Sequence, residues 1–342
     1  MAVQPALLLP GYSLGDVIGI GAFGTVRQAK CTKTGKIVAV KFISKSSVKP
    51  RHEEQELSNH RLMKHCNIVN LIEDIDSPKF LALVLDFAAN RDLLECMNRC
   101  HRVLPENTAR HIFLQLVAAL SHCHSHGVAH LDVKMENILF TETYEVKLAD
   151  FGHSIRLREG EMLTVPRGTP QYQAPEMLVT GCRFDGRQAD VWSCGVVLFA
   201  LLTHRLPFPY EPTLFAKIKQ GSYSIPEHVS EEAADLVRRM LEVDPARRIS
   251  IEEVANHPWS LSATLSGTVE AATAVDAEGA PRAGPPPKSP IASTGADGVP
   301  AAAVIARPRC RRAGALIVDR CRHSHRHRRS GARRRKVHHA AR

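Results

Sequence analysis

The chain has 342 residues, of which 44% are hydrophobic and 23% charged, so it can form one large or two ordinary globular domains. No apolar run reaches the roughly 18 residues of a membrane-spanning helix, and residues 1–12 lack the basic start of a secretory signal. The nine cysteines show no CxxC and no metal-ligand spacing, which is typical of reduced thiols. We therefore expect a cytoplasmic or nuclear protein that does not enter a membrane.

The formal net charge of +10 is concentrated near the C-terminus. Residues 261–342 contain 16 Lys and Arg against 5 Asp and Glu, a net of +11, which leaves −1 for residues 1–260. Residues 261–306 are rich in Ala, Gly, Pro and Ser and predict a flexible linker. Residues 307–342 are rich in Arg and His and predict a disordered tail, because so few apolar side chains cannot offset the conformational entropy of folding.

Three interpretations of this basic tail stay open. They are an inert solvated segment, a nuclear-import or nucleic-acid patch around residues 333–336, and a segment that binds adventitious metal through its histidines. The tail contains no aromatic side chain on which a base could stack, which argues against specific recognition of single strands. Nucleic-acid binding is therefore expected only through the tail, and the sequence predicts no oligomeric state.

The part of the chain before the linker changes its periodicity near its middle. Residues 12–87 show apolar runs typical of strands, interrupted by one helical stretch over about 51–64. Helical patterns follow in three later segments, residues 106–126, 189–202 and 230–241. The last of these begins with Ser230, a residue type that caps helices. The pattern predicts an α+β fold with a small β-rich lobe over about 12–87 and a larger helical lobe over about 88–260.

A glycine-rich segment, IGIGAFGTV, places Gly19, Gly21 and Gly24 in a G-x-G-x-x-G pattern. Glycines allow backbone amides to approach phosphate oxygens that any Cβ would keep away. In a dinucleotide-binding fold the glycines open a helix, and an acidic residue follows about 20 positions later. Here a strand follows instead, and Lys41 lies 17 residues after Gly24. The pattern favours a phosphate site in which Lys41 takes part, although a lone lysine on a strand is more often a solvated surface group.

The strongest motif is HLDVKMEN, which is followed by DFG 13 residues after its asparagine. In this pattern Asp132 can accept the proton of an attacking hydroxyl group, and Lys134 can reach a transferred phosphoryl group. Asn137 and Asp150 offer hard oxygen ligands for Mg²⁺. A turn or a helix cap would explain any one of these residues alone, but not the ordered set behind a glycine loop and a strand lysine.

These motifs resemble those of eukaryotic protein kinase domains, and the resemblance extends from about Tyr12 to Trp259. GTPQYQAPE resembles the substrate-docking loop, DVWSCG the start of the central helix, and DPARRIS the segment whose arginine, here Arg248, would pair with Glu176. LSNHRLMKHCNIV, CHSHGV and HPW resemble the calcium/calmodulin-dependent and SNF1-related kinase groups, and DVK with Thr169 resembles serine/threonine kinases. The resemblance implies transfer of the γ-phosphoryl group of ATP, with Mg²⁺ or Mn²⁺, to Ser and Thr hydroxyl groups of protein substrates.

The resemblance also implies a role for each site residue. Of the glutamates in the helical stretch, Glu53, Glu54 and Glu56, the spacing of Glu56 before His65 resembles that of the glutamate expected to pair with Lys41. The implied catalytic residues are Lys41, Glu56, Asp132 and Lys134, and the implied metal ligands are Asn137 and Asp150. The implied nucleotide contacts come from the glycine loop, the strands and the hinge: Gly19, Gly21, Gly24, Val26, Ala39, Lys41, Leu85, Asp86, Ala88, Asp92 and Leu139.

The catalytic loop departs from the kinase pattern at one position. The usual His-Arg-Asp is His130-Leu131-Asp132 here, and leucine cannot bind the phosphate of a phosphorylated activation segment. The position that usually carries this phosphate is Val165, and the neighbouring Thr164 is out of register. We therefore predict catalysis that does not depend on activation-segment phosphorylation read through the catalytic loop.

Acidic residues near the implied site predict a substrate preference. Asp92 follows Asn90 and Arg91, which replace the usual glycine pair, and it is suited to the ribose or to a substrate arginine. Glu136 adds a second acidic contact. We therefore expect substrates with Arg or Lys upstream of the target hydroxyl group.

An active enzyme is the leading hypothesis, and two alternatives come from other classes. A pseudokinase or scaffold would bind partners through the kinase fold, but such proteins typically lack the strand lysine or one of the two aspartates, and Lys41, Asp132 and Asp150 are all present. A nucleic-acid-binding protein is supported by the basic tail alone.

Overall fold

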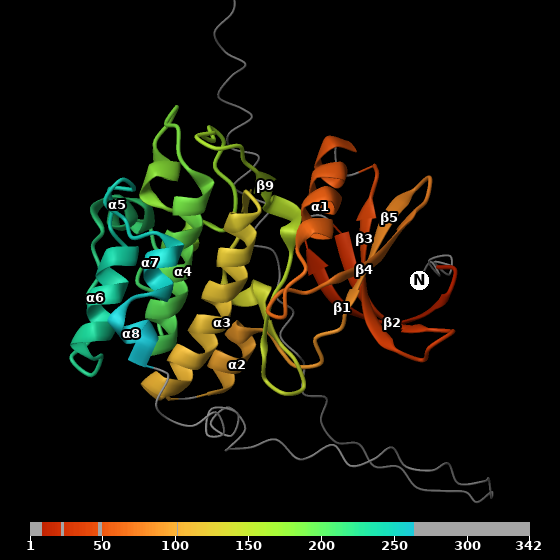
Figure 1. The fold of residues 1–342 in the computed structure, drawn as a ribbon, viewed down its shortest axis with the longest axis horizontal. Coiled ribbons are helices and arrows are strands. Elements are labelled where there is room, and N and C mark those ends of the chain that lie inside the picture. The colour runs from red at the N-terminus through yellow and green to blue at the C-terminus, as the bar shows by residue number, and fades with distance from the viewer. Residues whose placement is uncertain (1–8, 22–23, 47–49, 101, 263–342) are drawn as a thin grey trace, which may run out of the picture. The chain divides into compact units, whose positions relative to one another are not determined.

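The computed structural model describes residues 9–21, 24–46, 50–100 and 102–262. Within these ranges the chain forms a β-rich lobe with one long helix and a helical lobe, which confirms the predicted two-lobed α+β fold (Figure 1). The predicted linker and basic tail lie outside the described residues, apart from residues 261–262. None of the helices in the described part of the chain is long and apolar enough to span a membrane.

The β-rich lobe is a five-stranded antiparallel sheet in the order β1-β2-β3-β5-β4. Its strands are β1 Tyr12–Gly21, β2 Gly24–Cys31, β3 Ile37–Ser44, β4 Leu71–Asp76 and β5 Phe80–Asp86. The central strand β3 is buried on both faces, which explains why its sequence reads as an almost continuous apolar run. The lobe also contains helix α1, Pro50–Leu62, close to the predicted helical stretch. In this register Lys41 lies between Val26 on β2 and Leu83 on β5.

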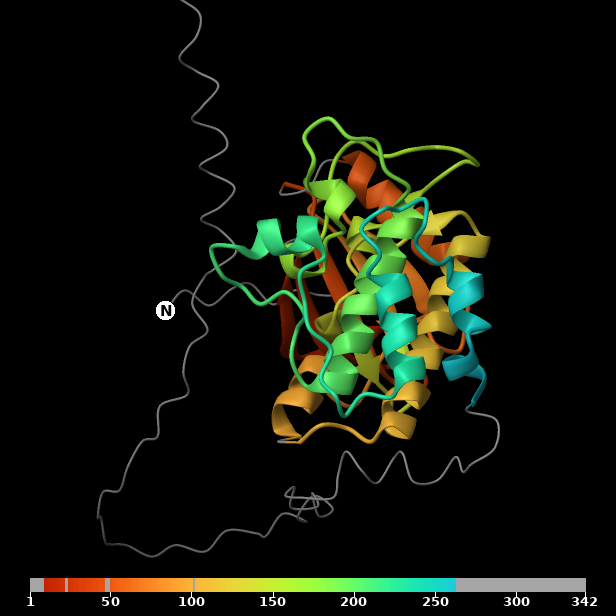
Figure 2. The same cartoon turned by 90° about the vertical axis from the view of Figure 1, so that its left-hand side faces the viewer.

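The helical lobe is built around α4, Gly186–Thr203, whose residues are buried along almost its whole length. This helix contacts both α3, Glu106–Ser125, and α6, Glu231–Met240 (Figures 1 and 2). The remaining helices are α2 Leu93–Arg99, α5 Leu214–Gln220, α7 Ile251–Ala255 and α8 Pro258–Leu261. Two short antiparallel strand pairs are also present, β6 Val128–Ala129 with β9 Ile155–Arg156 and β7 Ile138–Phe140 with β8 Val146–Leu148. In the chain they flank the HLDVKMEN loop and the DFG segment.

The long predicted helices are found, whereas several short elements were not predicted. Ser230 caps α6 as expected, since its hydroxyl oxygen accepts a hydrogen bond from the backbone nitrogen of Ala233 at 3.2 Å. Helix α4 begins three residues earlier than predicted, because Asp185 caps it through the backbone nitrogen of Arg187. Helices α2, α5, α7 and α8 are too short to show a full amphipathic period, and so the sequence alone did not separate them from loops.

Candidate active site

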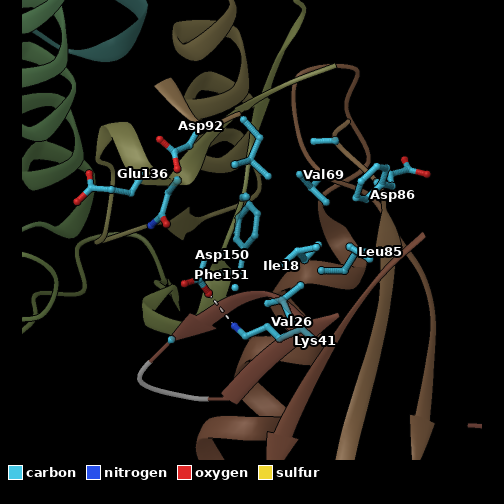
Figure 3. A pocket seen from close by; sticks show the side chains of 18 of the residues that line it. Ile18, Val26, Lys41, Val69, Leu85, Asp86, Asp92, Glu136, Asp150 and Phe151 are labelled. Carbon is cyan, nitrogen blue, oxygen red and sulfur yellow. Dashed lines mark hydrogen bonds and ion pairs between the residues drawn. The ribbon is translucent and has the colours of Figure 1, made fainter. Parts of the chain in front are cut away.

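A cavity of about 740 Å³ lies between the two lobes (Figure 3). Strands β1–β3, the hinge after β5, and the segments around β7 and after β8 all line it. This volume is within the range of small-molecule and cofactor sites. All the implied site residues except Asp132 and Lys134 line the cavity.

Lys41 is held between two carboxylates that come from different segments. Its Nζ lies 2.6 Å from Oε1 of Glu56 on α1 and 2.7 Å from Oδ1 of Asp150, the residue that follows β8 by two positions. Figure 3 shows Lys41 and Asp150 pointing toward each other. The pairing with Glu56 is therefore confirmed, while Glu54 is exposed and the side chain of Glu53 lies outside the described residues.

The charges of Lys41, Glu56 and Asp150 shift one another's pKa values. Burial by itself would lower the pKa of Lys41, but the charges of Asp150 and Glu56 outweigh burial and raise that pKa. Burial likewise opposes ionisation of Asp150, yet the adjacent Lys41 cation lowers the pKa of Asp150 to about 2. The site therefore holds a lysine cation beside an ionised aspartate over the whole physiological pH range.

The catalytic loop is anchored by a buried aspartate that the sequence reasoning did not select. Asp190, in the first turns of α4, accepts hydrogen bonds from the backbone nitrogens of His130 and Leu131, both at 2.7 Å. It also accepts one from His124 Nε2 at 2.9 Å. These contacts hold Leu131 in a left-handed backbone conformation, with a φ of 64°, directly before Asp132. Asp190 is part of DVWSCG, and that motif is the only sequence signal that could have indicated its role.

Asp132 is the centre of a network of short polar contacts. Its Oδ2 lies 2.8 Å from Nζ of Lys134 and accepts a hydrogen bond from Nδ2 of Asn137 at 3.1 Å. Its Oδ1 accepts hydrogen bonds from the backbone nitrogen and the hydroxyl group of Thr169, at 3.1 and 2.9 Å. Burial opposes ionisation of Asp132, but the charge of Lys134 lowers its pKa below the ordinary value. The network keeps Asp132 an anion. Thr169 is part of it, although the sequence analysis named Thr169 only as a feature that resembles serine/threonine kinases and did not place it in the site.

Asn137 and Asp150 fit the requirements of a hard divalent cation. The amide nitrogen of Asn137 donates to the carbonyl oxygen of Asp132 at 2.8 Å, which leaves its side-chain oxygen as the atom that can bind a metal ion. Asp150 uses Oδ1 for Lys41 and for the backbone nitrogen of Gly152, so Oδ2 remains. Within the described residues no group of three or more His, Cys, Asp or Glu could hold a metal ion. These two ligands would therefore need phosphate and water oxygens to complete an octahedral shell.

Apolar side chains line the end of the cavity next to the hinge. They are Ile18, Val26, Ala39, Val69, Leu85 and Leu139. The backbone nitrogen of Asp86 already donates to Asn70 at 3.1 Å, so only its carbonyl oxygen remains for a ligand. The side chain of Asp86 pairs with Lys36 at 3.0 Å and is therefore occupied by the fold. Ala88 and Asp92 lie further along the same cavity wall.

The three glycines of the predicted phosphate loop differ in whether the fold leaves room for a side chain at their positions. A Cβ on Gly24 would lie 1.8 Å from the carbonyl oxygen of Phe42, so this glycine is needed for the close approach of β2 to β3. Gly19 and Gly21 have room for a Cβ, and both line the cavity. The loop tip, residues 22–23, lies outside the described residues. The fold therefore requires glycine at position 24 whether or not the loop binds a phosphate.

A buried histidine on α1 contacts the DFG segment, and sequence reasoning missed it. The His60 ring centroid lies 4.8 Å from that of Phe151, which in turn lies 5.0 Å from that of His130. Nε2 of His60 is 2.7 Å from the carbonyl oxygen of Val69. The ring thus joins α1, the segment before β4 and the DFG segment, and Phe151 in turn contacts the catalytic loop. Burial lowers the pKa of His60 from 6.5 to about 4, so the folded protein keeps it neutral.

We expect this histidine to make the fold sensitive to acid. Between pH 6.5 and 4 the unfolded chain binds a proton that folded His60 does not, so stability is lost as pH falls through this window. The gap between the two pKa values corresponds to about 3 kcal/mol. Urea unfolding at pH 7 and pH 4.5 should therefore show a smaller loss of stability for His60→Leu than for the wild type. The exposed His111→Gln is the control, and equal losses in all three proteins would contradict the expectation.

Comparisons with known proteins agree with this geometry. The chain matches the protein kinase domain family over residues 12–260. It is 41% identical over 257 residues to the serine/threonine protein kinase OSK3 of Oryza sativa subsp. indica, a match that covers 73% of this chain and 50% of the relative. It is 38% identical over 258 residues to the SNF1-related protein kinase catalytic subunit alpha KIN12 of Arabidopsis thaliana, with 74% and 52% covered. The chain thus spans about half the length of the curated relatives it matches. With this match and the site described above, the chain belongs to the protein kinase family.

Proposed function

We propose that this chain is an ATP-dependent serine/threonine protein kinase that transfers the γ-phosphoryl group of MgATP to Ser and Thr hydroxyl groups of proteins. One observation carries the proposal. Lys41, Glu56 and Asp150, from three separate segments, meet within 2.7 Å at a cavity of nucleotide size, next to the loop that holds Asp132. Similarity to a relative named as a serine/threonine protein kinase supports the choice of acceptor.

Each residue has a defined task in this reaction. Mg²⁺, held by Asn137 and Asp150, would neutralise charge on the phosphate oxygens. Lys41, which Glu56 and Asp150 hold in place, would bind phosphate oxygens of the nucleotide. Asp132 orients the substrate hydroxyl group and accepts its proton.

Lys134 lies beside Asp132, the proposed proton acceptor, where it could also contact the phosphoryl group during transfer. Its Nζ lies 2.8 Å from Asp132 and 3.0 Å from the hydroxyl oxygen of Thr169. A cation at this place can stabilise the charge on the phosphoryl group as it passes to the substrate oxygen. Thr169 therefore fixes both residues relative to the segment on which the substrate would lie.

Transfer of radiolabelled phosphate from ATP tests the function. The wild type with Mg²⁺ or Mn²⁺ should label a generic basic protein on Ser and Thr, and Asp150→Ala should not. Equal labelling by the two proteins would overturn the proposal. The absence of labelling by a folded wild type would do so too, and it would favour a scaffold.

We further propose that the activation segment, residues 150–176 from DFG to APE, is held by apolar contacts in place of a phosphate. A Cβ built on Gly186 would lie 3.2 Å from Cδ2 of Leu131 and 3.1 Å from Cδ1 of Leu163, so these two side chains converge on α4. The backbone of Leu163 pairs with that of Phe184 through hydrogen bonds of 2.8 and 3.0 Å. Leu131, which is buried, thus supports the activation segment through packing.

Removing the hydroxyl group of Thr164, which follows Leu163, should therefore change the kinase activity little. Thr164 is exposed, and we expect Thr164→Ala and phosphatase-treated wild type to keep activity within about twofold of the untreated protein. Leu163→Asp should lower activity about tenfold or more, because burying a polar group against Leu131 costs about 1–3 kcal/mol. Initial rates with one protein substrate measure both effects. Near-complete loss of activity in folded Thr164→Ala would contradict the proposal.

The acidic residues at the cavity mouth support a preference for basic substrates. Asp92, Glu95 and Glu136 all line it, and Figure 3 shows the first and last of these on the same side. Glu95 is already paired with Arg91 at 2.6 Å and with a second arginine. By contrast, Glu136 forms no ion pair with an Arg or Lys of the described residues, and its side chain hydrogen-bonds to that of Tyr172. A substrate arginine or lysine that reaches the cavity can pair with this carboxylate.

We expect Glu136→Gln to weaken this preference. A peptide with Arg upstream of its only Ser should lose about tenfold in kcat/KM, since a hydrogen bond to a charged group contributes about 1.5–3 kcal/mol. A matched peptide with Ala in place of that Arg should lose less. Steady-state kinetics on the two peptides measure the ratio, and a wild type without any preference for the basic peptide would contradict the assignment.

A further inference from the structure

Arg167 differs in its partners from the other partly or fully buried arginines whose side chains the structure describes. Its side chain is half-buried, and burial lowers its pKa. The others hydrogen-bond to backbone or carboxylate oxygens: Arg27, Arg110, Arg187 and Arg248. No carboxylate of the described residues forms an ion pair or hydrogen bond with it. A partly buried cation without a counter-ion loses hydration that no partner replaces. Such a group is suited to an anion that arrives from outside the chain.

The surroundings place this cation beside the reaction centre. Arg167 lines a small hollow together with Asp132 and Thr169. Its charge, like those of Asp132 and Lys134, also acts on the nearby His153. Since Asp132 is already paired with Lys134 at 2.8 Å, it is not available to Arg167. Arg167 is therefore a cation next to the acceptor site that no described carboxylate pairs with.

The backbone of this segment is fixed independently of the Arg167 side chain. Gln173 Nε2 donates to the carbonyl oxygens of Arg167 and Gly168, at 3.0 and 3.3 Å. Gly168 has a φ of 82°, and a Cβ there would lie 2.3 Å from the carbonyl oxygen of Leu131, so only glycine allows this close approach. Thr169 is bound to Asp132. The loop therefore holds the backbone of Arg167 in a defined place, and removing the side chain leaves these contacts intact.

We propose that Arg167 binds an acidic side chain, Asp or Glu, that directly flanks the phosphorylated residue of the protein substrate. The planar guanidinium group can donate two parallel hydrogen bonds to a carboxylate. This inference rests on the proposed kinase function and adds a second determinant of specificity to it. The upstream basic residue would meet Glu136, whereas the flanking acidic residue would meet Arg167.

Peptides with a single Ser, an upstream Arg and one varied flanking residue test the inference. The flanking residue is Ala, Asp, Glu or Lys, placed in turn directly before and directly after the Ser. For the wild type we expect kcat/KM to be at least about tenfold higher with Asp or Glu than with Ala on one of the two sides, mainly through KM. Arg167→Ala should bring this ratio close to one, and Arg167→Glu should reverse it in favour of Lys. Arg158→Ala, an exposed arginine of the same segment, should keep the wild-type ratio.

The possible outcomes separate the two proposals. If the wild type phosphorylates the Ala peptide but shows no acidic preference, the role of Arg167 fails while the kinase function stands. If no peptide and no protein is phosphorylated, the kinase function itself fails. An acidic preference that survives in Arg167→Ala would also overturn the inference. So would an effect of Arg167→Ala that disappears in the Thr164→Ala background, because Arg167 would then bind a phosphate on Thr164.

Discussion

Lys41→Met should lower kcat/KM for phosphoryl transfer by about 10²- to 10³-fold, the loss that follows removal of one preorganised charge from an active site. Lys41 lies 2.6 Å from Glu56 and 2.7 Å from Asp150, and no other cation of the described residues reaches both. Methionine has a similar length but no charge. The variant would therefore lose the proposed phosphate-binding cation and leave two carboxylates facing each other, which would disturb Asp150, the proposed metal ligand.

The matched control is Lys45→Met, one residue beyond the same strand. Lys45 pairs with Asp76 at 2.5 Å, but both side chains are partly exposed and far from the reaction, so activity should stay within about twofold. Initial rates at saturating and limiting ATP, with circular dichroism to verify the fold, measure the effect. A folded Lys41→Met that keeps more than a tenth of wild-type activity would show that Lys41 does not bind the phosphates.

Arg248→Ala should lower the free energy of unfolding by about 3–5 kcal/mol, because it leaves a buried carboxylate without its partner. The implied pairing with Glu176 is confirmed. Nη1 and Nη2 of Arg248 bind the two carboxylate oxygens at 2.7 and 2.9 Å, and the arginine side chain is 0% exposed. The guanidinium group also donates to the carbonyl oxygens of Glu242 and Gln188 at 3.0 and 2.9 Å. It lies over the ring of Trp192, so it joins the activation segment to α4.

The neighbouring Arg247 provides the control within the same turn. Its side chain is 75% exposed and lies 3.8 Å from Glu242, so Arg247→Ala should change stability by no more than about 0.5 kcal/mol. Urea unfolding of the full chain, followed by tryptophan fluorescence, measures both variants. Equal losses of unfolding free energy in Arg248→Ala and Arg247→Ala would mean that burial of the Arg248–Glu176 pair does not determine its contribution to stability.

The grouping of polar side chains that lie in one short motif was predictable from the sequence. Asp132, Lys134 and Asn137 lie within six consecutive residues, so their mutual arrangement depends on one local loop conformation. The long helices were predicted as well, since each shows several turns of apolar periodicity. Lys41 and Glu56 are only 15 residues apart, and the strand and helix patterns between them limited the possible partners to three glutamates.

Contacts between distant segments were not predictable in the same way. Asp190 holds the catalytic loop from 60 residues away, and His60 reaches Phe151 across the two lobes. In the local sequence around Asp190 and His60, nothing distinguishes these two residues from an ordinary surface aspartate or histidine. Their roles arise because packing buries them beside particular backbone groups, and burial depends on the whole fold rather than on local sequence.

The sequence by itself determined the fold class and the chemistry, because glycine spacing, a strand lysine and the order of the catalytic carboxylates are local patterns. It also identified Leu131 as the departure from the kinase pattern. Only the tertiary structure showed that Leu131 packs with Leu163 against α4, and that the guanidinium group of Arg167 is half-buried without a counter-ion. The physical reason is that hydration, burial and ion pairing belong to three-dimensional neighbourhoods, which here combine residues from segments far apart in the chain.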